Sequence, residues 1–278
     1  MKSKKRSSRH MRLLSWNVQW CRGLDGRVDP KRIADEAKRI ADPDVFCLQE
    51  IARYFPEMEG SAGEDQVEVL AREFPGYEAF FAPGVDLPGK RGRRRFGNLV
   101  LTRLAVGRVL RHQLPWPSAS AVRSMPRAAV EVVVEAPFGL LRVMTTHLEY
   151  YSKDHRTAQI ERLRELHAEA CAEHLPVDEP GSYESHTRAK SALVCGDFNL
   201  KPDDPGHRQM LDAGFVDAWL ALNPGKPRQA TFHLHDGEPP YCCDYMFVTP
   251  DLVPRLRALR IETETQASDH QPVILDLA

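Results

Sequence analysis

The chain has 278 residues, with 38 basic and 39 acidic side chains and a formal net charge of −1. This length allows one large domain or two small ones with a sizeable core, and the balanced charge excludes a global positive field that would attract nucleic acid or membranes. The six cysteines lie mostly in apolar stretches and lack disulfide or CxxC spacing, which is typical of reduced, buried thiols in a cytoplasmic protein.

Basic residues are concentrated in two short segments. Residues 1–10 are rich in Lys and Arg and have almost nothing to bury, so we expect a disordered basic tail before a single domain over residues 11–278. This tail lacks the apolar segment of a secretory signal, and no later stretch reaches membrane-spanning length. The second segment, Lys90 to Arg95, lies in a Gly- and Pro-rich stretch, residues 83–95, that predicts a surface loop. The loop either grips a polyanion or is simply solvated.

The start of the domain predicts a β-α-β unit. Residues 11–18 form an apolar strand with Asn17 near its end, a helix begins at Asp29-Pro30, and residues 44–50 form a second buried strand with Glu50 at its tip. Strands joined by a helix run parallel, so their carboxyl ends lie at one edge of the sheet. Asn17 and Glu50 are therefore expected to be neighbours.

The middle of the chain alternates strand-like runs with turns. A short helix around residues 66–74 precedes apolar runs at residues 77–81, 99–102, 106–113, 128–135 and 140–146. A turn signal at residues 137–139 predicts that the last two runs form a hairpin, and His147 follows the second of them. The longest helix is predicted from residue 154 to about residue 175, because apolar residues there recur along one stripe.

A further apolar strand, residues 192–195, opens into Gly196-Asp197-Phe198-Asn199. Alternate side chains of an extended chain share a face, so Asp197 and Asn199 point the same way while Phe198 points into the core. Gly196 allows backbone or ligand to approach closely. This tetrapeptide alone is most often an Asx-capped turn, so its meaning depends on the other polar strand ends.

Two later polar groups precede strands instead of following them. Asp244 introduces residues 245–248, and Asp269-His270 introduces residues 272–277. If these strands run antiparallel to the earlier ones, their amino ends lie at the edge that holds the other strands' carboxyl ends. All the polar groups would then converge on one cleft.

Together these segments resemble the endonuclease/exonuclease/phosphatase superfamily, which includes nucleases like DNase I, bacterial sphingomyelinases and inositol polyphosphate 5-phosphatases. The resemblance covers residues 12–277 and rests on six short motifs in sequence order: Ser15-Trp16-Asn17, Leu48-Gln49-Glu50, Thr146-His147-Leu148, Gly196-Asp197-Phe198-Asn199, Asp244-Tyr245 and Ser268-Asp269-His270. It implies an α/β (α+β) fold, a four-layer α/β/β/α sandwich with two mixed sheets, and a divalent-metal phosphoester hydrolase.

The resemblance also implies roles for individual residues. Glu50 would be the main Mg²⁺ ligand, with Asn17 beside it and Asp269 joining the metal site. Asp197 would orient the attacking water or hold a second metal.

The remaining implied roles concern protons and phosphate. His270 would act as general base or contact the phosphate, oriented by Asp244. Asn199 would hydrogen-bond the phosphate, and His147 would contact it and help protonate the leaving group.

Elementary chemistry is consistent with these roles. Phosphoester cleavage requires charge stabilisation around the phosphoryl oxygens and an activated water. Mg²⁺ requires only one or two protein carboxylates, a histidine titrates in the working pH range, and a neighbouring carboxylate fixes its tautomer. Mn²⁺ is an alternative ion.

For several other residues the sequence leaves more than one role open. Arg127 and Asn98 either bind the phosphate or are ordinary structural residues, Arg127 then lying at the surface. His233 and His235 share a face, but without a third ligand ordinary loop histidines are the better interpretation. Cys242-Cys243 departs from the pair that often precedes this aspartate in the family, which leaves subgroup and substrate open.

These observations predict a cytoplasmic, monomeric Mg²⁺-dependent phosphodiesterase or phosphomonoesterase. Nucleic acid is one candidate substrate, because the basic loop could follow a phosphate backbone. A phosphorylated small molecule, such as a lipid headgroup or an inositol phosphate, is the alternative. A hypothesis of another class is a non-catalytic binding module that retains the fold.

Overall fold

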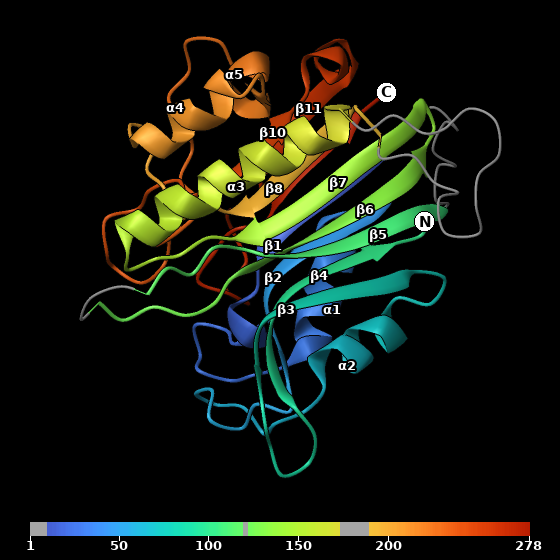
Figure 1. The fold of residues 1–278 in the computed structure, drawn as a ribbon. Helices are drawn as coiled ribbons and strands as arrows, with labels where there is room; N and C mark the ends of the chain where they lie inside the picture. The colour runs from blue at the N-terminus through green and yellow to red at the C-terminus, as the bar shows by residue number, and fades with distance from the viewer. Residues whose placement is uncertain (1–9, 119–121, 173–188) are drawn as a thin grey trace, which may run out of the picture.

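The computed structural model describes residues 10–118, 122–172 and 189–278, and it contains two six-stranded mixed sheets. Most of the predicted basic tail, residues 1–9, lies outside the described residues. The first sheet has the order β11-β12-β1-β2-β4-β3 and the second β5-β6-β7-β8-β10-β9 (Figure 1). None of the helices in the described ranges combines the length and apolar character needed to cross a bilayer.

The strands of the first sheet are β1 Met11–Asn17, β2 Val45–Arg53, β3 Glu78–Leu87, β4 Arg94–Thr102, β11 Leu256–Ile261 and β12 Val273–Leu277. Those of the second are β5 Val106–Gln113, β6 Ala128–Ala136, β7 Gly139–His147, β8 Ala192–Asp197, β9 Val216–Asp217 and β10 Asp244–Val248. The helices are α1 Pro30–Ile40, α2 Gln66–Glu73, α3 Lys153–Ala172, α4 Pro205–Asp212 and α5 Ala218–Leu222, with short 3-10 turns η1 Gln19–Cys21 and η2 Pro250–Arg255.

Successive side chains of each strand point alternately to the space between the two sheets and to the helices outside, and this alternation produces the layers of the fold. In β1, Leu13 belongs to the apolar cluster between the sheets, whereas Leu14 and Trp16 pack with α1 and α2 on the outer face. In β8, Cys195 faces the first sheet and Val194 packs with α3. Figure 1 shows α3 running across β7 and β8 while α1 and α2 cover the other sheet. The predicted four-layer α/β/β/α sandwich is confirmed.

Strand direction also follows the expectation. β1 pairs parallel with β2, and β7 pairs parallel with β8. β12 is antiparallel to β1, and β10 is antiparallel to β8, which places Asp244 opposite Asp197. The amino ends of β10 and β12 therefore lie at the edge that holds the carboxyl ends of β1, β2, β7 and β8.

Two predicted boundaries are wrong. Residues 83–95 are not one surface loop, because β3 and β4 continue through most of them as a hairpin in which Asp86 pairs with Arg95 and Leu87 with Arg94. Cross-strand ion pairs from Asp86 to Arg93 and Arg95 stabilise it despite its Gly, Pro and Arg content. Glu50 is not at a strand tip, since β2 continues beyond it to Arg53.

Gly196 allows β7 and β8 to approach closely at the cleft. Its φ is +132°, and a Cβ there would lie 1.9 Å from the Thr146 carbonyl oxygen. Gly139 has a similar φ of +121°, but a Cβ added there would meet nothing within 4 Å. A larger residue would therefore be strained in its backbone at both positions, but it would be crowded only at Gly196.

Replacing these glycines by alanine should separate the two effects. We expect Gly139→Ala to lower the free energy of unfolding by about 1–3 kcal/mol through backbone strain alone, and Gly196→Ala to lower it by clearly more. Urea unfolding followed by circular dichroism measures both. Equal losses in the two variants would show that contact with Thr146 does not constrain this position.

Candidate active site

A cleft of about 630 Å³ opens where the strand ends of both sheets meet. Its lining includes most of the residues singled out from the sequence: Glu50, Arg127, His147, Asp197, Asn199, Asp269 and His270. Asn17 and Asp244 lie directly behind them, bonded to Glu50, Asp197 and His270. The structure thus brings together side chains that are up to 253 positions apart along the chain, from Asn17 to His270.

Glu50 reaches the cleft because β2 contains a bulge. The register between β2 and β4 shifts between Leu48 and Ile51, and Glu50 has a φ of +61°. The bulge turns the Glu50 carboxylate toward the cleft while Gln49 stays buried. Gln49 Nε2 donates to Thr145 Oγ1 of the second sheet at 2.8 Å, which anchors the bulge across the sheet interface.

Asn17 links carboxylates from both sheets. Its Nδ2 donates to Glu50 Oε1 and to Asp197 Oδ2, both at 3.0 Å. Its Oδ1 accepts a hydrogen bond from the Gln19 backbone N–H at 3.0 Å. In this orientation the amide nitrogen, and not the oxygen, faces the carboxylates, so Asn17 holds Glu50 and Asp197 in place.

Three carboxylates share this apolar-walled site. Burial raises the pKa of Glu50 to about 7, and the nearby Asp269 carboxylate adds to the shift. Burial also raises the pKa of Asp197, to about 6, and that of Asp269. Each raised pKa reflects a carboxylate whose charge lacks full compensation. An oxygen-liganded dication would supply that compensation, and the donor set of carboxylates fits Mg²⁺ or Mn²⁺.

His270 is held between two aspartates. Its Nδ1 lies 3.0 Å from Asp244 Oδ2, and its Nε2 lies 3.6 Å from Asp197 Oδ2. Burial favours the neutral ring, but the Asp244 and Asp197 charges outweigh it and raise the pKa of His270 to about 10. The ring also stacks on Phe232, with centroids 4.3 Å apart. His270 is therefore an oriented imidazolium at neutral pH.

His147 has the opposite charge state. Its Nε2 lies 3.4 Å from Asp197 Oδ2 and its Nδ1 3.7 Å from Glu50 Oε1. Burial, together with the positive charges of Arg127 and His270, holds the pKa of His147 well below its usual value. A neutral His147 offers one N–H donor to a ligand in the cleft.

Arg127 is buried at the cleft, not a surface arginine. Its Nε lies 3.5 Å from Glu149 Oε2, but Nε and Nη1 make no hydrogen bond to any described residue. A buried guanidinium that lines a cleft and has unpaired donors is suited to an anion. This observation favours the phosphate-binding alternative for Arg127.

Asn98 and Asn199 are partly engaged in the fold. Asn98 Nδ2 donates to the Ala128 carbonyl at 2.7 Å, tying β4 to β6, and Asn98 lines a small recess beside the main cleft. Asn199 lies in the cleft wall with a φ of +51°, and its Nδ2 donates to the Leu148 carbonyl at 2.9 Å. Asn199 is thus closer to a ligand in the cleft than Asn98.

Two residues that support the site were not predicted from the sequence. Thr231 Oγ1 donates to Asp244 Oδ2 at 2.6 Å, and no spacing or periodicity marks this threonine. Glu149 is fully buried beside Arg127. It lies two positions after His147, so the alternation of an extended chain could have placed it on the same face.

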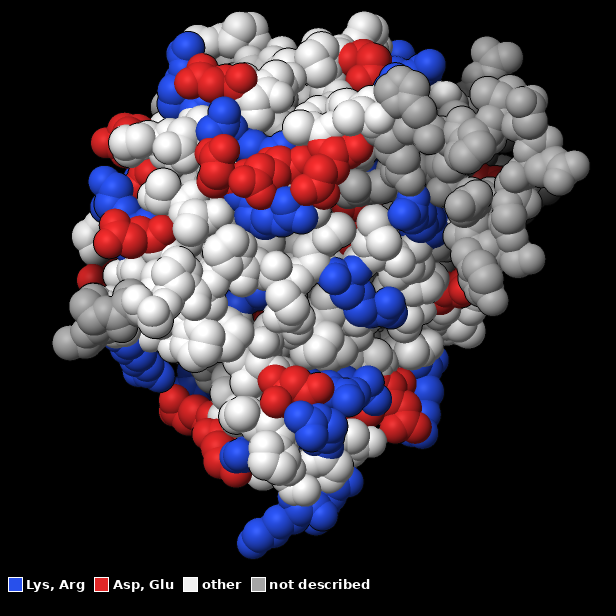
Figure 2. All heavy atoms as spheres, in the orientation of Figure 1, with Lys and Arg blue, Asp and Glu red and all other residues white. Residues whose placement is uncertain are grey.

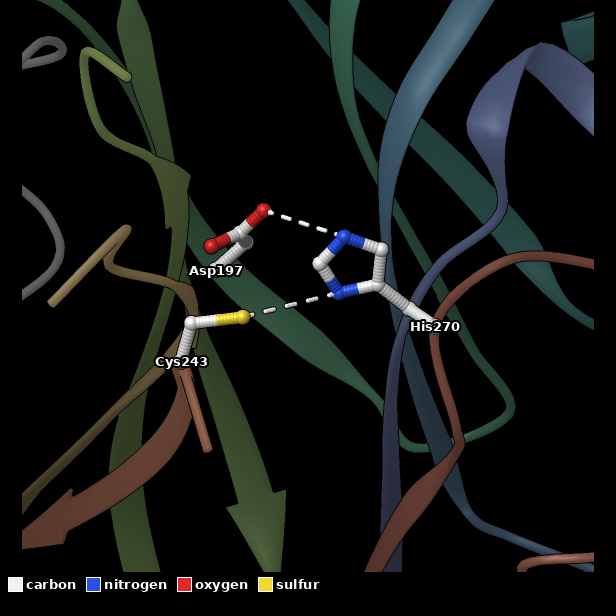
Figure 3. A group of neighbouring side chains, drawn as sticks. All are labelled: Asp197, Cys243 and His270. Carbon is white, nitrogen blue, oxygen red and sulfur yellow. Dashed lines mark hydrogen bonds and ion pairs between the residues drawn. The ribbon is translucent and has the colours of Figure 1, made fainter. Parts of the chain in front are cut away.

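The two loop histidines contact different partners. His233 Nδ1 lies 2.6 Å from Asp236 Oδ2, whereas His235 Nε2 lies 2.7 Å from the Thr263 carbonyl oxygen. Within the described residues, the single group of three or more His, Cys, Asp or Glu with metal-like spacing is Asp197, Cys243 and His270 (Figure 3).

Comparison with solved structures shows many similar folds. A protein described as an endonuclease/exonuclease/phosphatase from Beutenbergia cavernae DSM 12333 is 24% identical, with a TM-score of 0.69 over 97% of this chain and 71% of that one. A mannosyl-6-phosphatase from Bacteroides thetaiotaomicron VPI-5482 is 18% identical, with a TM-score of 0.68 over 96% and 99% of the two chains. D. rerio TDP2 complexed with a single strand DNA product is also 18% identical, with a TM-score of 0.66 over 97% and 99%.

A search of curated proteins finds no significant match. The model of the endonuclease/exonuclease/phosphatase family, in contrast, matches residues 14–270, which include every residue that lines the cleft. The chain therefore belongs to the endonuclease/exonuclease/phosphatase family of phosphoesterases.

Proposed function

We propose that the chain is a divalent-metal-dependent phosphodiesterase. The observation that carries the proposal is the cleft itself, where three carboxylates with raised pKa values face a His–Asp pair and a buried arginine with free donors. The carboxylates supply ligands for a cation, and the arginine and imidazolium supply positive charge for a phosphate. A binding module has no need for this combination of groups with perturbed pKa values.

Glu50 and Asp269, whose carboxylates lie near each other in the cleft, are the residues that would hold the ion. When bound, Mg²⁺ or Mn²⁺ would supply positive charge for the phosphoryl oxygens and lower the pKa of water. In the orientation observed here, Asn17 acts as the residue that positions Glu50 and Asp197, and it would have to turn its amide to become a ligand.

The directions of the pKa shifts support one division of the proton steps. Asp197, with a pKa of about 6, is ionised at neutral pH and accepts the proton of the attacking water. His270 is already protonated, so it stabilises the developing phosphoryl charge instead of acting as the base, and Asp244 keeps its ring oriented. His147, at the end of β7, and Arg127, just before β6, donate hydrogen bonds to the phosphate from the second sheet.

The cleft walls favour one class of substrate. They include several aromatic residues, among them Trp20, Phe55, Phe96, Tyr150 and Tyr151. Beyond the floor, formed by Glu50, His147, Asp197, Asp269 and His270, the lining has three acidic residues, Glu57, Glu59 and Glu149, and two arginines, Arg123 and Arg127. A multiply phosphorylated inositol would require several cations there. A single phosphodiester flanked by ring systems, as in single-stranded nucleic acid, fits these walls better.

The β3–β4 hairpin, which carries Lys90 to Arg95, offers less unpaired positive charge than its sequence suggests. Arg93 and Arg95 pair with Asp86, and Arg94 pairs with Glu57. Figure 2 shows red atoms among the blue ones toward the end of the molecule where the β3–β4 hairpin lies in Figure 1. Nucleic acid binding would therefore depend on stacking in the cleft more than on this hairpin. A lipid headgroup remains the second candidate substrate, since its phosphodiester meets the same floor.

Replacing Glu50 or His270 should slow hydrolysis strongly. With bis-p-nitrophenyl phosphate and Mg²⁺ or Mn²⁺, Glu50→Gln and His270→Ala should each lower kcat at least ~100-fold, because each removes charge that stabilises the transition state. Glu78→Gln, at the exposed start of β3, is the control and should retain the wild-type rate. Equal rates in all four proteins would end the enzyme proposal and favour a binding module.

Metal binding should be measurable without substrate. Mn²⁺ or Mg²⁺ at about 100 times its Kd should raise the Tm of the chelator-treated protein by about 5 °C, because the ion binds only the folded cleft. The Glu50→Gln variant should show a much smaller rise in thermal-shift measurements. The same rise in wild type and variant would place the ion elsewhere.

Aromatic truncation should distinguish the substrates. Tyr150→Ala and Tyr151→Ala should each raise KM for a single-stranded oligonucleotide by about 10-fold, the value of one lost base-stacking contact. Their rates on bis-p-nitrophenyl phosphate should change less. Trp116→Ala, equally exposed but outside the cleft lining, is the control. Turnover of sphingomyelin with no cleavage of DNA or RNA would overturn the nucleic acid assignment.

A further inference from the structure

Cys243 is a buried thiol in the catalytic cluster that the proposed hydrolysis does not use. It precedes β10, and its Sγ lies 3.9 Å from His270 Nδ1 and 3.5 Å from Asp244 Oδ2. Figure 3 shows Cys243 and Asp197 at the two different nitrogens of the His270 ring. The thiol is free and fully buried.

These three ligand atoms have the spacing of a tetrahedral metal site. The third separation, from His270 Nδ1 to Asp244 Oδ2, is 3.0 Å. A zinc ion with a Zn–S bond of ~2.3 Å and Zn–N and Zn–O bonds of ~2.0 Å holds its ligand atoms about 3.3 to 3.5 Å apart. The observed separations of 3.0, 3.5 and 3.9 Å lie on both sides of that range, so shifts of a few tenths of an ångström complete the site.

A fourth ligand position is also available. Ligand atoms of Asp197, Cys243 and His270 all lie within 4.8 Å of one another. Because Asp197 Oδ2 lies at the other nitrogen of the ring, 3.6 Å from Nε2, the ligand left for this fourth position is a water molecule. The donor set then contains sulfur and nitrogen, which select zinc over magnesium.

We propose that Cys243, His270 and Asp244 form a second metal site, specific for a thiophilic divalent cation such as Zn²⁺, whose occupation inhibits hydrolysis. On binding, the Cys243 thiol and His270 Nδ1 each release a proton to solvent, and the resulting thiolate, imidazole and carboxylate coordinate the ion. His270 then loses both its positive charge and its hydrogen bond to Asp244. The inhibitory part of this inference rests on the proposed function, whereas the binding part does not.

The neighbouring cysteine provides a matched control. Cys242 is also buried, but its Sγ contacts Arg228 Nη1 at 3.9 Å and the Asp244 backbone carbonyl at 3.4 Å. Arg228 in turn pairs with Asp217, on the side away from the cleft. Replacing Cys242 by serine therefore removes a buried thiol of the same segment and leaves the proposed site intact.

Binding is tested first, without substrate. Metal-free full-length protein is titrated with Co²⁺ under reducing conditions, and the thiolate-to-cobalt charge-transfer absorption is recorded. We expect this band in wild type and Cys242→Ser and no band in Cys243→Ser or Cys243→Ala. Two Cys243 variants are used so that misfolding of one does not decide the result, and circular dichroism verifies the fold. A band of equal strength in the Cys243 variants, or no band in wild type, would overturn the site.

Inhibition is tested second, at fixed saturating Mg²⁺ with bis-p-nitrophenyl phosphate. Each protein is normalised to its own rate without Zn²⁺. The Zn²⁺ concentration for half inhibition should rise at least ~10-fold in the Cys243 variants and stay unchanged in Cys242→Ser, because loss of a direct ligand exceeds the usual effect of losing an outer partner. Equal inhibition of all variants would locate the inhibitory zinc elsewhere. A cobalt band in a protein with no hydrolytic activity would reject the proposed function and retain the metal site.

Discussion

The geometry of the site depends on a few buried hydrogen bonds that join the two sheets at the cleft. Glu50 lies in the first sheet and His270 lies just before its strand β12, whereas His147, Asp197 and Asp244 lie in the second sheet. The bonds from Asn17 to Asp197 and from Gln49 to Thr145 fix how one sheet lies on the other. Apolar packing between the sheets is not directional, so these polar contacts are what define the distances between the side chains of the cleft.

The same constraint explains the charge states. Burial raises the pKa of Glu50, Asp197 and Asp269, and a nearby carboxylate adds to each shift, Asp269 in the case of Glu50 and Asp244 in the case of the other two. This unfavourable energy must be offset by packing elsewhere. Glu50 adds backbone strain, since its φ of +61° is uncommon for a side chain other than glycine, asparagine or aspartate. The strain and the raised pKa values mark the places where the fold places side chains for a ligand instead of for stability.

Much of this arrangement follows from sequence patterns. Alternation predicts which face of each strand is buried, and the β-α-β rule predicts that Asn17 lies beside Glu50. What the patterns cannot give are features that depend on a neighbour in space. The bulge at Glu50 exists only relative to β4, and the β3–β4 hairpin is stabilised by ion pairs to Asp86 that no local propensity encodes. The sequence identifies Arg127 as a candidate just before β6, but its burial follows from packing against Glu149. Spatial neighbours decide whether a lone charge is solvated or functional.

His270 lies at the boundary between two kinds of chemistry. Its Nε2 faces Asp197 and the oxygen-rich floor, where hard cations are favoured, while its Nδ1 faces Asp244 and the Cys243 thiol. Affinity for nitrogen and sulfur donors rises from manganese to zinc across the divalent metals. One imidazole therefore cannot serve phosphate chemistry and also ligate a thiophilic ion through Nδ1, because coordination there removes the proton and the aspartate contact on which its charge depends. In the proposed second site, competition between hard and soft cations would follow from the position of a single sulfur atom beside this ring.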